Sequence, residues 1–322
     1  MKIRFILTVA VILLVVLPEG YSQLLDAEKK LKEQKADTTM GWKKGGLLAI
    51  NLAQTSLTNW AAGGQNSFAT NGLLSLFANY KSEKSTWVNS LDAGYGFLKQ
   101  NGMDSRKTDD KFDFLSKYGR QAFDHVYYAA LLNFKTQLAE GLNYPDPANP
   151  DDGVRISNFF APAYLIAALG MDYKPNASFS AFIAPLTAKF TFVTDPVLSA
   201  AGAFGVDPGE KVNSEFGGYI RVIYTKNDFK SEFMKNISLT SKIDLFSNYL
   251  LNPQNIVVNW DNLIAMKINR FISATITTTL IYDDKIRVPF DRNGDGETEA
   301  GESVGSKIQF KEILGVGFSY NF

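Results

Sequence analysis

Apolar and polar residues alternate along most of this chain with the two-residue period of β-strands. The alternation is clearest at 271–283, where isoleucine, leucine and alanine share one face, and serine and threonine share the other. Twelve such stretches are expected to be strands: 45–55, 66–80, 86–99, 110–120, 126–142, 159–173, 178–193, 215–226, 236–250, 256–269, 271–283 and 307–322. An even number of strands, most of them with one apolar and one polar face, predicts an all-β, transmembrane antiparallel β-barrel.

The segments between these stretches are alternately short and long. The short ones are 81–85, 121–125, 174–177, 227–235 and residue 270. The long ones are 56–65, 100–109, 143–158, 194–214 and 284–306, and only 251–255 is short where a long loop is expected. Outer-membrane barrels have short periplasmic turns and longer external loops. The alternation therefore supports twelve strands independently of their composition.

The end of the chain carries a second indication of a barrel. Its last strand has an apolar, aromatic face and ends on Phe322. This tail resembles the C-terminal signal by which outer-membrane barrels are recognised for assembly, with Gly317, Tyr320 and Phe322 at the glycine, hydrophobic and aromatic positions. It departs from that signal at Gly315, where a polar residue is more usual. The resemblance implies the barrel-assembly machinery as a partner, whereas a soluble β-sandwich could also end on such a strand.

The first residues are typical of a secretion signal. Two basic residues precede an apolar run that ends at Leu17. Gly20 and Ser22 then occupy the minus-three and minus-one positions of a cleavage site. The expected organisation is a signal peptide at 1–22, a periplasmic N-terminal extension at 23–40 and a barrel at 41–322. The charged extension is either a flexible tail or a short docking helix.

Composition narrows the class of protein further. The chain has no cysteine, which excludes disulfides and thiolate metal sites. It has 33 basic and 33 acidic residues, and without Lys2, Arg4 and Glu19 of the leader 31 and 32 remain. This balance gives no indication of a nucleic-acid partner. No stretch after the leader is long and apolar enough for a spanning helix, so a membrane crossing would require a closed barrel in contact with outer-membrane lipid.

One loop carries a metal-binding motif. Residues 291–302 read DRNGDGETEAGE and match the calcium-loop pattern D-x-N-x-D-G-x5-E at every specified position. The expected ligands are Asp291, Asn293, Asp295, Glu297 through its carbonyl, and Glu302 as a bidentate carboxylate. Strands replace the usual flanking helices, so a solitary calcium-ordered loop is expected. The alternative is a solvated acidic hairpin rich in turn dipeptides.

Charged residues fall on the polar faces of several predicted strands. Those expected to point into the barrel are Lys111, Lys117, Lys135, Lys189, Arg221, Lys242, Lys267, Asp92, Asp113, Asp244 and Asp261. Such a set could bind or sort small polar solutes in a channel. Alternatively, the charges pair across a narrow interior and plug it, because buried charges need partners. A twelve-stranded barrel lies between the filled eight-stranded kind and the open porins.

Four segments together resemble a Bacteroidota family of predicted outer-membrane barrels defined only as a domain of unknown function. They are GWKKGG at 41–46, QTSLTNWAAGGQNSF at 54–68, KIDLFSNYL at 242–250 and QFKEILGVGFSYNF at 309–322. The resemblance spans nearly all of the mature chain, and TNWAAGGQNS is its most specific piece. It implies fold and location and brings no catalytic residues.

Three functions follow as expectations. The first is a channel for small polar solutes, and the second is a non-conducting structural or accessory barrel that binds other envelope proteins. The third is a lipid hydrolase, since some barrels of this size use a serine and histidine near the outer leaflet. The only histidine, His125, falls in a short turn expected on the periplasmic side. The protein is therefore not expected to be an enzyme.

Overall fold

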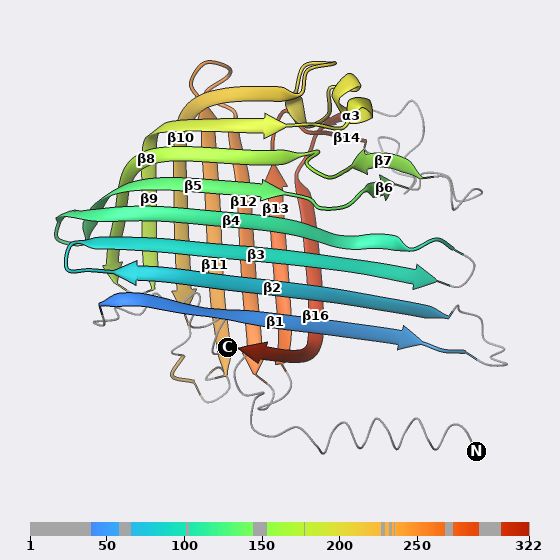
Figure 1. Ribbon diagram of the computed structural model, residues 1–322, viewed down its shortest axis with the longest axis horizontal. Coiled ribbons are helices and arrows are strands. Elements are labelled where there is room, and N and C mark those ends of the chain that lie inside the picture. Colours follow the sequence, from blue (N-terminus) through green and yellow to red (C-terminus); the bar gives the residue numbers. More distant parts are fainter. Residues whose placement is uncertain are drawn as a thin grey trace.

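The structure, a computed structural model, describes residues 40–57, 66–100, 103–143, 153–176, 178–226, 229–231, 234, 236–267, 273–289 and 304–321. Within these residues, twelve antiparallel strands form one closed barrel, which confirms the predicted fold class (Figure 1). The barrel strands are β1 (Gly41–Thr55), β2 (Ser67–Lys81), β3 (Ser85–Gln100), β4 (Arg106–Phe123), β5 (Val126–Thr136), β8 (Ala163–Asn176), β9 (Phe179–Phe192), β10 (Val212–Lys226), β11 (Ile237–Asn248), β12 (Ile256–Lys267), β13 (Ser273–Tyr282) and β16 (Gln309–Asn321).

The two ends of the barrel differ in their connections. At one, called the short-turn end here, residues 82–84 join β2 to β3 and residues 124–125 join β4 to β5. The opposite, long-loop end carries two small sheets, β6 (Gly141–Asn143) with β7 (Val154–Ser157) and β14 (Arg287–Pro289) with β15 (Val304–Ser306). It also carries helix α3 (Pro196–Ala200) and the 3-10 turn η2 (Ala203–Gly205) (Figure 1).

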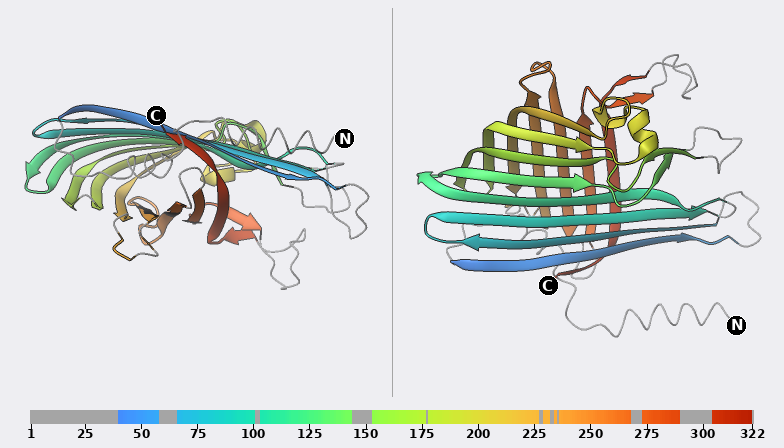
Figure 2. Two further views of the ribbon diagram at one scale, coloured as in Figure 1. Left: turned by 90° about the horizontal axis from the view of Figure 1, so that it is seen from below. Right: turned by 45° about the horizontal axis from the view of Figure 1, so that its top comes forward.

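The barrel is flattened, and the strands of its two faces run across each other (Figure 2). In Figure 1, β1 to β5 run horizontally in front of β11, β12 and β13, which run vertically. The bent strand β16 joins the two faces. Its residues 309–317 pair with β13, whereas 318–321 pair with residues 47–50 of β1 and close the barrel. Flattening brings opposite walls close enough for side chains to meet across the interior.

Inward side chains fill one side of that interior. Leu131, Phe182, Tyr219 and Phe246 are buried and form a common apolar cluster with neighbouring alanines. They belong to β5, β9, β10 and β11. The residues that alternate with them are largely exposed on the outer surface in β5, β9 and β10, and half-buried in β11. The interior on this side is therefore a packed core rather than an open pore.

The strand β8 was apolar on both faces in the sequence, so its facing could not be predicted. The structure buries Ala168 and Asp172 inside and exposes Leu169 and Met171 outside. Ala168 and Asp172 are four residues apart and thus on the same face of the strand. Asp172, a lone carboxylate in an apolar stretch, was the available signal for this assignment.

A β-bulge interrupts β9 next to β8. Pro185 and Leu186 both face outward, and the register with β8 shifts between Leu169 and Met171. Proline lacks a backbone N–H and is tolerated where the hydrogen-bond ladder is broken. A Cβ at Gly170 would lie 2.0 Å from the carbonyl oxygen of Ile183, so only glycine fits opposite the bulge.

Three sequence expectations about strands are corrected. The fifth strand ends at Thr136 and not at 142, because 141–143 pair with β7 in a separate sheet. The sixth begins at Ala163 and not at 159, because Asn158 and Ala161 exchange backbone hydrogen bonds in a turn. Asn71 and Gly72 form a dipeptide typical of turns, which predicts a bulge or a break inside the second strand. This prediction is wrong, since β2 pairs there with both neighbours without a register shift. Among the described helices, none is long and apolar enough to cross a membrane.

Candidate functional site

Four of the charged residues that were expected to point inward meet in a group called the central cluster here. Its members are Asp113, Asn133, Lys135, Tyr219, Arg221 and Asp244. They come from β4, β5, β10 and β11, and all but Lys135 are buried. The cluster is built by the two-residue period, because each member lies on the polar face of its own strand.

Arg221 and Asp244 form the firmest pair in this cluster. Nε of Arg221 donates to Oδ1 of Asp244 at 2.6 Å, and its second amino group donates to Oδ2 at 3.0 Å. The buried hydroxyl of Tyr219 donates to the same carboxylate at 2.7 Å. A bidentate hydrogen bond of this kind fixes the planar guanidinium in one orientation.

The central cluster also joins walls that are not neighbours in the sheet. Lys135 of β5 lies 3.8 Å from Asp113 on the adjacent strand and 3.9 Å from Asp244 on the opposite wall. Arg221 of β10 reaches the side-chain oxygen of Asn133 on β5 at 3.4 Å. Since β5 pairs only with β4 and β8, these contacts cross the lumen.

A wetter side of the lumen lies beside this cluster. Lys242 pairs with Asp261 at 3.1 Å, and the two side chains are 23% and 24% exposed. Lys135 is 25% exposed, and Lys111 is exposed on the same face of β4 as Asp113. Water therefore reaches charges of both signs within the barrel.

A second ion-pair group lies nearer the short-turn end. Nζ of Lys117 is 2.6 Å from Asp172, and both side chains are buried. Lys174 also contacts this carboxylate, at 3.1 Å, and Ser180 donates to its other oxygen at 2.9 Å. A cavity of about 180 Å³ lies between this group and the central cluster, with Lys117, Arg221 and Lys242 in its lining.

A third ion-pair group lies toward the long-loop end. Lys189 contacts Glu215 at 3.1 Å and Asp283 at 3.4 Å. Lys285 donates to Glu215 from the connection after β13, at 2.7 Å. Lys189 was predicted to point inward, whereas Asp283, Lys285 and Glu215 were not singled out. Asp283 and Lys285 lie beyond the end of β13, where periodicity gives no facing.

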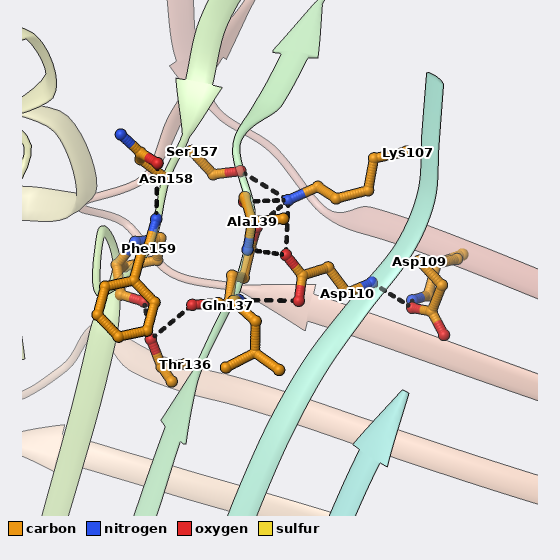
Figure 3. Close-up of polar contacts among 12 residues, drawn as sticks. Lys107, Asp109, Asp110, Thr136, Gln137, Ala139, Ser157, Asn158 and Phe159 are labelled. Atoms are coloured by element: carbon orange, nitrogen blue, oxygen red, sulfur yellow. Dashed lines mark hydrogen bonds and ion pairs between the residues drawn. The ribbon is translucent and has the colours of Figure 1, made fainter. Parts of the chain in front are cut away.

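The connection between β5 and β8 is fastened to the barrel rim. Nζ of Lys107 contacts Asp110 at 2.8 Å, the carbonyl of Ala139 at 2.8 Å and the hydroxyl of Ser157 at 3.3 Å (Figure 3). Asp110 in turn accepts the backbone N–H of Leu138 at 2.9 Å. The side chain of Lys107 therefore anchors the loop to the barrel rim.

Asp195 fastens the next connection. Its carboxylate caps α3 by accepting the backbone N–H groups of Val197 and Leu198. It also accepts hydrogen bonds from Asn158 at 2.8 Å and Arg155 at 3.0 Å. The hydrogen bond from Asn158 is the largest of the contributions that lower the pKa of Asp195. The segment around α3 and the β6–β7 sheet thus form one structured cap at the long-loop end.

The remaining predicted residues have mixed outcomes. Lys267 is the last residue of β12, and its side chain lies outside the described part of the structure. Gly317 pairs with Ser273 and Tyr320 with Leu48 in the last strand, and their role in an assembly signal stays a prediction. His125 lies in the turn at the short-turn end, and its Nε2 is 3.3 Å from Asp124.

Several predictions fall outside the described residues. These are the signal peptide at 1–22, the extension up to residue 39, Phe322 and the calcium ligands Asp291, Asn293, Asp295, Glu297 and Glu302. Among the residues that are described, no group of three His, Cys, Asp or Glu side chains could hold a metal ion. The calcium loop therefore stays a prediction.

Comparison with known families gives one partial match. The family described as "Protein of unknown function (DUF3078)" matches residues 52–142, which include the whole segment 54–68. Over this part of the chain, the match supports the expected likeness to a family of unknown function. No curated protein matches the chain.

Solved structures of outer-membrane barrels give remote matches. The chain is similar to an outer membrane channel from Pseudomonas putida F1 at 9% identity and a TM-score of 0.37, covering 89% of this chain and 97% of that one. It is similar to the translocator domain of autotransporter NalP from Neisseria meningitidis at 10% identity and a TM-score of 0.31, covering 94% and 98%. BamA from Haemophilus ducreyi lacking POTRA domains 1–3 matches at 9% identity and a TM-score of 0.18, covering 86% and 70%. All three TM-scores are low, so the fold assignment rests on the strand pairing of this chain.

Proposed function

We propose that this protein is an outer-membrane β-barrel of a Gram-negative bacterium, with its long-loop end outside the cell and its short-turn end in the periplasm. A closed barrel satisfies its backbone hydrogen bonds without water. Large apolar side chains such as Leu169 and Ile183 are exposed on its outer wall, where lipid would cover them. Near the short-turn end, Trp87, Tyr118 and Tyr128 face outward, which is typical of an aromatic belt at a membrane interface.

Of the functions expected from the sequence, the non-conducting accessory barrel has the better support. The observation that carries it is the bridge across the lumen from Lys135 and Asn133 to Asp244 and Arg221. Removing one partner of a buried pair typically costs about 3–5 kcal/mol. A pore on the packed side of the lumen would have to separate such pairs, so any passage is confined to the side of Lys242 and Asp261. The structured cap around α3 would then serve as the surface that other envelope proteins bind.

A channel for small polar solutes is the second candidate. It is favoured by the exposed Lys111 and by the partly exposed Lys135, Lys242 and Asp261 on the wetter side of the lumen. The cavity beside Arg221 and Lys242 extends this polar region toward the short-turn end. No observation favours the lipid hydrolase, and the proposal includes no catalytic activity.

Single-channel conductance of the purified barrel in a planar bilayer separates the two candidates. If the barrel is non-conducting, the wild-type protein is expected to give no discrete current steps. The double variant Asn133→Ala with Lys135→Ala, which lacks the bridge from β5, is expected to give such steps. Discrete steps from the wild type, with an ion selectivity that Lys242→Gln changes, would instead establish the channel. Heat modifiability on gels verifies that each variant is a folded barrel.

Membrane location is tested separately by density fractionation of cell envelopes. The protein is expected with the outer membrane, and deletion of Phe322 is expected to lower its amount there because the assembly signal loses its terminal aromatic residue. Recovery in the soluble periplasmic fraction would contradict the location. Unchanged assembly of the deletion variant would contradict only the role given to the tail.

A further inference from the structure

An apolar groove runs along the outer wall over β4, β5, β8 and β9. Its wider part, of about 760 Å³, lies between Tyr118 and Tyr128 on one side and Met171, Ile183 and Leu186 on the other. A narrower part of about 560 Å³ continues it toward the middle of the barrel and shares Tyr118 and Leu186 with the first. The two parts form one continuous depression.

The groove exists because small residues line it where the neighbouring side chains are large. Its floor includes Ala130 of β5, Ala167 and Gly170 of β8, and Ala188 of β9. At Gly170 the backbone of β9 approaches so closely that no side chain fits, as the bulge at Pro185 requires. The depression is therefore set by backbone geometry and by the sequence, and it does not depend on the rotamer of one residue.

Arg120 is the only charged residue in the lining of the wider part. It is exposed on β4 and faces outward, two residues beyond Tyr118 toward the short-turn end. Within the described part of the chain, Arg120 has no ion-pair or hydrogen-bond partner for its side chain. A cation thus lies at one end of an otherwise apolar groove.

The level of Arg120 on the barrel matches a membrane interface. Tyr118 and Tyr128 stand beside it, and Trp87 is paired with Tyr118 on the next strand. Aromatic residues of this kind lie at the height of lipid head groups, and arginine binds phosphate oxygens with two parallel N–H groups. From this level the groove extends along the strands into the region that acyl chains would occupy.

We propose that this groove is a binding site for one phospholipid of the leaflet at the short-turn end, with its phosphate at Arg120 and an acyl chain along Ala130, Ala167 and Ala188. The inference goes beyond the proposed function and rests only on its placement of the barrel in a membrane. It requires neither an open nor a closed lumen. Charge complementarity at Arg120 distinguishes this site from ordinary lipid contact with the outer wall.

Native mass spectrometry of the full-length protein in detergent tests the site with two probes of identical acyl chains, phosphatidylglycerol and diacylglycerol. The wild type is expected to retain one phosphatidylglycerol and to bind diacylglycerol at least tenfold more weakly. Arg120→Gln should lower phosphatidylglycerol retention at least tenfold, because the groove loses its phosphate ligand. Ala167→Phe should lower the retention of both lipids, because it fills the floor.

Two matched variants exclude general effects of charge and bulk. Lys230→Gln removes an exposed cation between β10 and β11 at the same end, and Ala274→Phe adds the same bulk to the strand β13, away from the groove. Both are expected to retain the lipid as the wild type does. Equal retention by Arg120→Gln and wild type, or equal binding of the two probes, would overturn the proposal. Loss of heat modifiability identifies any variant that has not folded, and Arg120→Lys then replaces Arg120→Gln with partial retention expected.

Discussion

Arg221 of β10 holds Asp244 of β11 through two parallel hydrogen bonds in the middle of the barrel, at 2.6 and 3.0 Å. The two residues are also directly opposite each other in the strand register. The pair is buried, and Lys135 approaches the same carboxylate from the far wall. One carboxylate therefore balances two cations from different faces of the barrel.

Asp244→Ala is expected to destabilise the barrel by about 3–5 kcal/mol, because it leaves Arg221 without its charged partner in a buried position. Urea unfolding in detergent micelles, followed by tryptophan fluorescence, measures the change. Lys311→Gln is the matched control. It removes an ion pair with Asp109 in which Lys311 is 53% exposed, and such pairs contribute less than about 1 kcal/mol. Similar losses from both variants would contradict the importance given to the buried pair.

Gly170→Ala is expected to lower stability by about 1–3 kcal/mol, the usual cost of overpacking. Its new methyl group would meet the backbone carbonyl of Ile183 at 2.0 Å, and backbone cannot move aside as a side chain can. Gly72→Ala provides the comparison, because the nearest atom to its Cβ is 3.9 Å away. The same urea unfolding assay applies. If both substitutions are tolerated equally, the close approach at the bulge is wrong.

The cap at the long-loop end is expected to loosen in acid. Asp195 has a pKa below its ordinary value of 3.8, because Asn158, two backbone N–H groups and Arg155 stabilise its charged form. A lowered pKa contributes stability that is complete above the ordinary value and is lost as the pH falls through the lowered one. Proteolysis by pepsin should therefore cut near α3 increasingly fast below about pH 3.8. Pepsin should cut the Asp195→Asn variant fast throughout that range. A cleavage rate of the wild type that is independent of pH would contradict the role of the carboxylate.

Calcium is expected to raise the melting temperature of the purified barrel. The motif at 291–302 offers carboxylate and amide oxygens at the spacing that a calcium loop requires. Asp291→Ala with Glu302→Ala should abolish the rise by removing the first and the last ligand. Differential scanning calorimetry with calcium, with magnesium and with chelator makes the comparison. An identical rise in the double variant would reject the site.

The sequence predicts the barrel well because its main signal is local. Alternation identifies strands such as β13 and places Arg221 and Asp244 inside, since inward and outward positions simply alternate. The alternation fails at Pro185, where a bulge places two consecutive residues on the outer face. The alternation of residues within a single strand contains no information about such a shift in register.

The cross-lumen contacts are less accessible to sequence reasoning. The contact between Lys135 and Asp244 depends on how far the barrel is flattened and on the angle at which its two faces cross. Neither quantity is encoded in any one strand. Asn133 and Glu215 were missed for the same reason, because a polar residue on a strand becomes informative only when the opposite wall is known.

The pairing of β1 with the last four residues of β16 makes closure of the barrel depend on the end of its last strand. Residues 47–50 meet 318–321, so the two ends of the sheet are joined by partners from nearly opposite ends of the chain. Without residues 318–321, the other strands would form an open sheet with two unpaired edges. Such edges recruit other chains, and a nascent protein in this state needs an escort until its last residues arrive. Among the described residues the pairing of β1 with β16 is the shortest ladder of the barrel, yet it removes both remaining unpaired edges at once.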